Sequence, residues 1–492
     1  MRKPCEMSLQ IRTAKALTAA LSVLLLVAEP HTVHGAGEFS PPGLYNPEVY
    51  RLENGLQVVL RPRVGSRSVA IRAVVELGTA HFPCPKQETP HFLEHLLFTG
   101  TTQHSEEELE LLISSHGGSW NAATGDRQTV YEIDIFSGHA ALGIETLHEI
   151  LTDTEIADAK VELSREVLQL EAGGAPSAVA ILLDRSGIFH SAATRAFNRL
   201  MSPYASVCTP PALASDVSST EIKAAYRSYY VPANMSLVVV GDFDVDAMRA
   251  TIQGTFGGMP AAPFVAAPRG QIPPHPGAIA LTGFGGQASV GFVFRTGGYL
   301  SEDHAALWVL ESYLRQRLYQ VLRVERGLTY TPSISYSPST EVGLFSISAE
   351  VEGENAIETL GLIDAEIDRI RKRDVDLDAL EKAREGLLLS YSQGFESNAD
   401  VADYYVESLF ELASHGAFVD EEGMLKSLSL DAILGVGASA FAADKAVSIR
   451  DRRVYFEEIM TGSAVVAVFV VGYVPWRLIR QGKSARRRRK IP

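Results

Sequence analysis

Cysteine is scarce in this sequence, with only Cys5, Cys84 and Cys208 among 492 residues. Their spacing matches no cysteine-based zinc site, which excludes the zinc-finger and zinc-ribbon classes. Cys84 and Cys208 could form a disulfide in an oxidising compartment, but two cysteines do not settle this. The glycine cluster at residues 283–286 lacks the further spacing of a dinucleotide-binding loop, so we expect a turn at the end of a strand there.

Basic residues are in the minority, because 44 Lys and Arg stand against 59 Asp and Glu, for a formal charge of −15. The excess is larger in the body: residues 1–36 contribute +2 and residues 477–492 contribute +8, which leaves −25 between them. Such an acidic body would repel nucleic acid and could favour basic peptides, although a solvated acidic surface is the simpler explanation. We therefore expect no nucleic-acid partner.

The N-terminus combines four basic residues, an uncharged run at 16–28 and a small-residue stretch that ends at Ala36. This order is typical of a secretory signal peptide. We expect residues 1–36 to be a signal peptide and the body to be exported to the extracytoplasmic, periplasmic side. The alternative is an N-terminal anchor that is never cleaved.

A second apolar run lies near the C-terminus, where residues 459–476 carry no charge. At about 1.5 Å per residue a helix of this length reaches roughly 27 Å, enough for a thin bilayer core. Eight basic residues follow within 477–492, the pattern of a cytoplasmic tail. We expect a transmembrane helix that anchors the body; the alternative is a buried strand followed by a basic tail that binds nucleic acid.

The body between these ends contains the same pattern of elements twice. In the first half, Asn54-Gly55 indicates a hairpin turn, β-rich runs follow, and a buried strand leads into a helix at Val245. After a Pro- and Gly-rich linker the order of strands and helices recurs, ending in a strand at residues 444–451. The second unit is thus complete before residue 459, which favours a membrane span there over a core strand.

We therefore predict an α+β protein made of two similar α/β sandwich halves, joined by a linker and followed by a transmembrane helix. The predicted parts are the signal peptide (1–36), a metal-binding half (48–256), the linker (257–278), a second half (279–457), the transmembrane helix (459–476) and a basic cytoplasmic tail (477–492).

The stretch TPHFLEHLLFTGT at residues 89–101 places two histidines and a glutamate among apolar residues. A helix that begins near Thr89 puts His91 and His95 on one face, four residues apart, with Glu94 beside them. Two neutral imidazoles at this spacing can hold one zinc ion, and the carboxylate could then take a proton from a water bound to it. The inverted HxxEH order is one of the known catalytic zinc motifs, but it requires a third ligand.

In this stretch the sequence resembles the family of pitrilysin, insulysin and the mitochondrial processing peptidase, whose third zinc ligand is a glutamate on a second helix. Here 75 residues lie between His95 and Glu171, and Glu171 falls within SREVLQLEAGG, which is similar to that helix. The resemblance implies one Zn²⁺ per chain, held by His91, His95 and Glu171. It departs at Ser164, where the family usually has a glutamate around the metal, so zinc orientation or affinity could be altered.

Two further stretches extend the resemblance. GGSWNAATGDRQTVYEI resembles the family's strand after the metal helix, which implies that Asn121 and Ala122 line an edge to which a peptide adds as a strand. An ordinary turn and strand is the alternative. LYQVLRVERGLTY resembles the family's Arg/Tyr element, which implies that Arg323 and Tyr330 bind substrate and stabilise the tetrahedral oxyanion.

The sequence therefore predicts a zinc-dependent endopeptidase that acts on peptides or unfolded segments, with Glu94, Arg323 and Tyr330 as catalytic residues. The resemblance also implies a homodimer with composite sites, or pairing with a related peptidase-like subunit. The alternative function is a non-catalytic assembly subunit, or one that only captures peptides.

Overall fold

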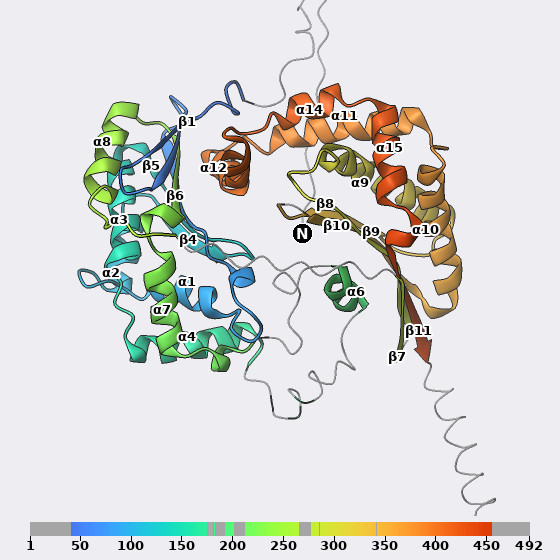
Figure 1. The fold of residues 1–492 in the computed structure, drawn as a ribbon, viewed down its shortest axis with the longest axis horizontal. Coiled ribbons are helices and arrows are strands. Elements are labelled where there is room, and N and C mark those ends of the chain that lie inside the picture. The colour runs from blue at the N-terminus through green and yellow to red at the C-terminus, as the bar shows by residue number, and fades with distance from the viewer. Residues whose placement is uncertain are drawn as a thin grey trace, which may run out of the picture. The chain divides into compact units, whose positions relative to one another are not determined.

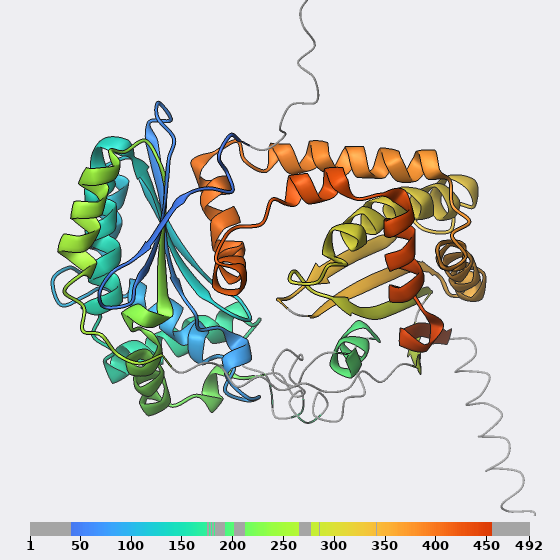
Figure 2. The same ribbon diagram turned by 45° about the horizontal axis from the view of Figure 1, so that its top comes forward.

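The computed structural model describes residues 41–174, 177, 179, 182, 192–200, 212–264, 277–284, 286–340 and 342–454. The predicted signal peptide, basic tail, most of the predicted linker, and Cys208 lie outside the described residues. Within the described residues the chain forms two α/β halves, each built on one mixed sheet (Figures 1 and 2). The two-domain α/β fold predicted from the sequence is thereby confirmed, while the exact boundaries stay a prediction.

The first half contains a six-stranded sheet, which we call sheet A. Its elements are β1 (Glu48–Arg51), β2 (Gln57–Pro62), β3 (Ser68–Val75), η1 (Thr79–His81), α1 (Thr89–Phe98), α2 (Glu106–Ser114), β4 (Ser119–Thr124), β5 (Thr129–Phe136), η2 (Ser137–His139), α3 (Ala140–Thr152), α4 (Asp158–Glu171), α6 (Ala192–Leu200), η3 (Ala214–Asp216), α7 (Ser219–Tyr229), η4 (Pro232–Asn234), β6 (Met235–Gly241) and α8 (Val245–Phe256).

The second half contains a five-stranded sheet, sheet B. The elements of this half are β7 (Gly277–Phe284), β8 (Gln287–Gly297), α9 (His304–Leu318), η5 (Tyr319–Glu325), β9 (Ser333–Pro338), β10 (Val342–Glu352), η6 (Gly353–Asn355), α10 (Ala356–Arg371), α11 (Leu377–Gln393), α12 (Asn398–Glu407), α13 (Leu409–His415), α14 (Glu421–Ser427), α15 (Leu430–Ala440), η7 (Ala443–Lys445) and β11 (Ala446–Val454).

The two sheets share one strand topology, as the repeated sequence pattern predicts. Sheet A runs β1-β2-β6-β3-β5-β4, and sheet B runs β7-β11-β8-β10-β9. In sheet A, the last strand β6 lies between β2, to which it is parallel, and β3, to which it is antiparallel. In sheet B, the last strand β11 lies in the same way between β7 (parallel) and β8 (antiparallel). Strand β1 is an addition to sheet A, paired with β2 across the turn at Asn54-Gly55. Because the strands correspond, α9 is the counterpart of α1.

Each sheet packs one face against its own helices. In the first half, apolar residues of sheet A, α1, α3, α7 and α8 form one buried cluster. In the second half, sheet B shares a cluster with α9, α10, α11 and α15. These clusters follow from the largely apolar runs of the central strands and the apolar stripes of the helices.

The opposite face of each sheet is covered by a helix from the other half. Helix α12 lies against β3 and β6 of sheet A, where Val401, Ala402 and Tyr405 pack against residues such as Val74 and Val238 (Figure 1). Helix α6 contributes Ala196 and Leu200 to a smaller cluster on sheet B. Both faces of the central strands are therefore apolar and buried, and each half completes the core of the other.

An ion pair connects α12 to the centre of sheet A. Arg72 of β3 has only 1% of its side chain exposed, and its guanidinium donates to Asp134 of β5 at 2.8 Å and to Asp403 of α12 at 2.7 Å. Although burial alone lowers the pKa of Arg72, these two carboxylates outweigh it and raise the pKa. A buried guanidinium needs such partners, so Arg72 fixes the position of α12 on the sheet.

The prediction that the fold includes a transmembrane helix is wrong. Among the described residues no helix has the length and apolar character to cross a membrane. A span needs about 20 mainly apolar residues, whereas the longest described helix, α11, has 17 and includes Lys382 and Arg384. Residues 459–476, where we expected the span, lie outside the described residues. Membrane anchoring and a membrane partner through this helix are accordingly withdrawn.

Gly241 tests how closely two central strands of sheet A pack. It is the last residue of β6, has a φ of +145°, and a Cβ there would lie 2.2 Å from the carbonyl oxygen of Ser68 in β3. We expect Gly241→Ala to destabilise the first half by more than about 2 kcal/mol, because backbone cannot move aside cheaply. Gly254→Ala, in an open position on α8, is the control and should be neutral or slightly stabilising. Urea denaturation curves of both variants measure the difference; equal midpoints would contradict this account.

Candidate metal centre

Helix α1 presents its polar residues on one side because the other side is fully apolar. Phe92, Leu93, Leu96 and Leu97 of α1 have no exposed surface. The helix begins at Thr89, with Glu88 as the residue before it and Pro90 in the first turn. His91, Glu94 and His95 remain on the partly exposed side.

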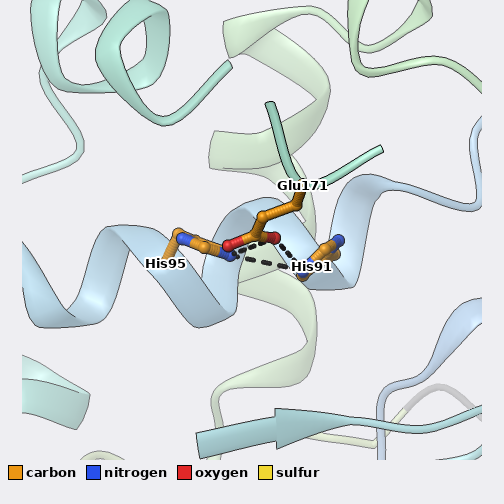
Figure 3. A group of neighbouring side chains, drawn as sticks. All are labelled: His91, His95 and Glu171. Carbon is orange, nitrogen blue, oxygen red and sulfur yellow. Dashed lines mark hydrogen bonds and ion pairs between the residues drawn. The ribbon is translucent and has the colours of Figure 1, made fainter. Parts of the chain in front are cut away.

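Helix α4 packs across α1 and brings its last residue to the two histidines. Val161, Ser164 and Leu168 form its buried face, spaced by three and four residues. The Arg165 guanidinium lies over the Phe92 ring of α1, 5.0 Å from its centroid. With α4 packed in this way, Glu171 at its end lies above α1 (Figure 3).

Three side-chain atoms converge between the helices, as Figure 3 shows. His91 Nε2 and His95 Nε2 are 3.2 Å apart, and Glu171 Oε2 is 3.4 Å from each of them. The three side chains are 31%, 21% and 48% exposed, respectively. They form the only group of three or more potential metal-ligating side chains in the described part of the chain whose ligand atoms all lie within 4.8 Å of one another.

The spacing of these atoms fits a tetrahedral zinc ion. Ligands at 2.0 to 2.2 Å from a tetrahedral centre lie about 3.3 to 3.6 Å from one another, close to the three distances observed. Two imidazoles and a carboxylate are also ligand types that zinc prefers. Three protein ligands leave one tetrahedral position open, which is the arrangement of a catalytic rather than a structural zinc.

Glu88, which we did not predict as a site residue from the sequence, holds the ring of His91 from outside the cluster. His91 Nδ1 lies 3.0 Å from Glu88 Oε2, so in the neutral ring Nδ1–H donates to this carboxylate and leaves Nε2 with a free lone pair toward the cluster. The signal available in the sequence was a carboxylate three residues before His91. Ser164 is 3% exposed and lies on the buried face of α4, the helix that ends at Glu171.

The charges around His91 favour a cation. Burial alone lowers the pKa of His91, but the hydrogen bond to Glu88 and the negative charges of Glu94 and Glu171 outweigh it and raise the pKa. The same surplus of carboxylate would stabilise a metal ion, which competes with protons for these side chains.

Glu94 lies on α1 between the two histidines, partly buried. Burial raises the pKa of the hydrogen-bonded phenols of Tyr131 and Tyr230, and the charge of Glu94 adds to both shifts. Glu94 is therefore near this pair as well as near His91. A carboxylate beside a metal position can accept a proton from a water there.

Asn121 and Ala122 lie on β4, which is the edge strand of sheet A. Ala122 packs toward the core with Trp120, while Asn121 is exposed on the opposite face. The Trp120 ring meets Phe98 of α1 edge-on, with 4.5 Å between centroids, so the strand runs beside the helix that carries His91 and His95. One side of β4 pairs with β5 and the other is left free in the described sheet, where an extended peptide could pair.

Arg323 and Tyr330 lie together in the second half, at the end of α9. Arg323 belongs to the π-helical segment η5, and its guanidinium lies 4.9 Å from the centroid of the Tyr330 ring. Tyr330 is 80% exposed. The structure thus brings this pair together, but among the described residues no hydrogen bond, ion pair or ring contact joins it to His91, His95 or Glu171. Sequence periodicity did not predict the π-helical turn, which often marks a functional segment.

Comparison with known proteins assigns the family. Residues 57–199 match the family model described as insulinase, peptidase family M16, and residues 216–387 match the model described as the peptidase M16 inactive domain. The two matches follow one another along the chain and together cover more than half of it.

Curated relatives agree with this assignment. The chain is 23% identical over 416 residues to the uncharacterized zinc protease YmxG of Bacillus subtilis, covering 81% of this chain and 97% of that protein. It is 26% identical over 213 residues to the beta subunit of the mitochondrial-processing peptidase of Blastocladiella emersonii. That match covers 43% of this chain and only 44% of the subunit.

Solved structures share the fold. A protease from Helicobacter pylori has a TM-score of 0.70 at 19% identity, over 83% of this chain and 99% of that one. The periplasmic protease PqqL from Escherichia coli has a TM-score of 0.67 at 15% identity, over 82% of this chain and 47% of that one. With both halves matched in sequence and the two-domain fold matched in structure, the chain belongs to the insulinase family of peptidases, family M16.

Proposed function

We propose that this protein is a zinc-dependent endopeptidase with one Zn²⁺ per chain, held by His91, His95 and Glu171. The observation that carries the proposal is the convergence of two imidazole nitrogens and one carboxylate oxygen at 3.2 to 3.4 Å, with Glu94 beside them. The zinc proteases among its relatives support the choice of metal.

The side chains divide the work of peptide hydrolysis. When bound, zinc would act as a Lewis acid that makes a water molecule nucleophilic near neutral pH. Glu94 accepts the proton of the attacking water and can then give it to the leaving amine. Glu88 keeps His91 in the tautomer and orientation that point Nε2 into the cluster.

The substrate is a peptide or an unfolded protein segment, which pairs with the free edge of β4 as an added strand. Asn121 and Ala122 line this edge, and the strand runs beside α1, so a scissile bond on it comes close to the metal position. Arg323 and Tyr330 are proposed to bind the substrate backbone and to stabilise the oxyanion. Their exposure leaves both side chains accessible to a substrate.

We propose export from the cytoplasm for the body of the protein. Cys84 is disulfide-bonded, and such bonds persist mainly in oxidising compartments. The similar Escherichia coli protease PqqL is described as periplasmic.

The alternative is a subunit without catalytic activity, which assembles with a peptidase or captures peptides. The match of residues 216–387 to a model described as inactive lies mostly in the second half and includes none of the three candidate ligands. The first half keeps all three candidate ligands and Glu94, so the enzyme is favoured.

Glu94→Gln tests the reaction. We expect full-length wild-type protein to bind one zinc and to cleave unstructured peptides, and the variant to keep its zinc while cleavage falls by at least about a hundredfold, because the proton acceptor is lost. Metal content is measured by mass spectrometry and cleavage by chromatography of the products. Protein that binds no zinc and cuts no peptide, in either form, would refute the proposal and favour the capturing subunit.

Glu88→Gln tests the support of His91. Loss of this carboxylate should weaken zinc binding by about 10- to 100-fold, the usual effect of removing a hydrogen-bond partner of a metal-binding histidine. Glu166→Gln, at an exposed position on α4, is the matched control and should leave the affinity unchanged. Competition with a chelator of known affinity measures both. Equal affinities in the two variants would show that Glu88 has no part in zinc binding.

Mixed variants test whether a second copy of the chain completes the site. If Arg323 and Tyr330 of one copy serve the metal cluster of another, Glu94→Gln and Arg323→Ala should each be inactive alone, yet mixing them after dissociation should restore about a quarter of wild-type activity through hybrid dimers with one intact site. No recovery, in samples shown by light scattering to contain dimers, would place the complete site within one chain.

A further inference from the structure

The second half contains a cavity of about 320 Å³ that shares no lining residue with the pocket at His91 and Glu171. It lies at the start of α9, the counterpart of the metal-binding helix. Its walls are mainly aromatic, and they are formed by Tyr299, Trp308, Tyr336, Tyr391 and Tyr404.

Three carboxylates face the same cavity. Glu411 is 4% exposed and the Glu421 side chain 13%, while Glu407 is exposed and marks the side that opens to solvent. No lysine or arginine lines the cavity, and no lysine or arginine forms a salt bridge with these three glutamates among the described residues. Glu411 accepts a hydrogen bond from the Val419 N–H at 2.7 Å, which satisfies only part of its acceptor capacity.

The charges of these carboxylates act on one another and on the aromatic walls. Burial raises the pKa of Glu411 to about 7, and the neighbouring Glu421 contributes to the rise against the effect of the Val419 hydrogen bond. Burial also raises the pKa of Tyr299 to about 12, with further contributions from Glu407, Glu421 and Glu411. The carboxylates therefore disfavour one another's negative charge, and either a proton or a bound cation would relieve this repulsion.

His304 gives an independent indication of a missing donor. It is 7% exposed and lines the cavity, and its Nε2 has no hydrogen-bond partner. The Tyr336 hydroxyl donates to the Gly297 carbonyl at 2.9 Å, so His304 Nδ1, 3.2 Å from that hydroxyl, is the donor between these two side chains. Nε2 of the neutral ring is then an acceptor, and it faces Glu421 Oε1 at 3.8 Å. Two acceptors at this separation can both receive N–H groups from one cation.

We propose that this cavity binds the ammonium or guanidinium group of a basic side chain on an extended polypeptide. The carboxylates and His304 Nε2 accept its N–H groups, and the rings of Trp308 and the tyrosines contact the cation through their faces. The proposal concerns a site separate from the metal cluster, so it does not depend on zinc chemistry.

A metal ion is a poorer occupant than an organic cation. Metal coordination requires several ligand atoms to converge, and among the described residues only the cluster in the first half meets that condition. An ammonium or guanidinium group is larger, is bound by dispersed acceptors, and is the type of cation that aromatic walls recognise.

The edge of sheet B favours a polypeptide over a small free cation. Tyr336 and Pro338 of the lining belong to β9, which is an edge strand of that sheet. An extended chain that adds to this edge would run beside the cavity and could place one basic side chain in it. The excess of acidic residues in the body would attract such a chain.

Calorimetric titration of the full-length protein tests the proposal. The Glu94→Gln form is used as the background so that no probe is cut. The probes are a capped pentapeptide with one central lysine, the same peptide with arginine, the same peptide with norleucine, and n-butylammonium. We expect both basic peptides to bind at least about tenfold more tightly than the norleucine peptide, because only they supply a charged donor.

Variants assign the binding to the cavity. Glu421→Gln should reduce the affinity for the basic peptides at least about tenfold while its zinc content stays unchanged, whereas Glu385→Gln, an exposed control on α11, should have no effect. If Glu421→Gln fails to fold, Trp308→Leu carries the same comparison through the loss of the cation–π contact. Equal binding of the lysine and norleucine peptides, or undiminished preference in the cavity variants, would overturn the proposal. If n-butylammonium binds as tightly as the lysine peptide, the assignment to a polypeptide is overturned.

Discussion

Each sheet of this protein has two apolar faces, and its own half supplies helices for only one of them. The other face is covered by α12 on sheet A and by α6 on sheet B, each from the opposite half. Without α12 or α6, the apolar side chains on this second face would be exposed to water, so neither half has a complete core alone. The buried Arg72 adds a directional contact to this exchange, because its two carboxylate partners lie on a strand of sheet A and on α12. The fold as a whole depends on this mutual covering.

The metal cluster depends in turn on the rigid first half. Helix α1 is fixed on sheet A by four side chains without exposed surface, and α4 is fixed on α1 by Arg165 over Phe92. The three converging atoms therefore come from two helices whose crossing is set by packing at other residues, and Glu88 orients His91 from outside. A site held in this way needs little reorganisation when it binds a metal.

The sequence predicted those features that follow from a local pattern. Apolar, β-rich runs indicated strands in both halves, and the spacing of His91 and His95 indicated a shared helix face. Glu171 was found only through its position in a family motif, since nothing local distinguishes it from Glu166.

The exchange of α6 and α12 could not be predicted, because an apolar stripe does not specify the surface that it will cover. The role of Glu88 depends on the side-chain conformation at a helix start, and the π-helical turn at Arg323 leaves no mark in the apolar pattern. The transmembrane prediction relied on an uncharged run and its basic flank, features that describe composition rather than any element of the described fold.

The free edge of β4 also carries a risk of aggregation. The backbone groups that would receive a substrate would equally receive the edge of another sheet, and open edges are a common start of aggregation. β4 has only six residues, and its exposed positions are Ser119, Asn121 and Ala123, none of them large and apolar. A short edge with small or polar side chains offers little to a second copy of itself, while a substrate can gain further contacts from the surrounding residues. If β4 receives a substrate as we propose, its short length and its small or polar exposed side chains would allow it to pair with a substrate while disfavouring pairing with another copy of itself.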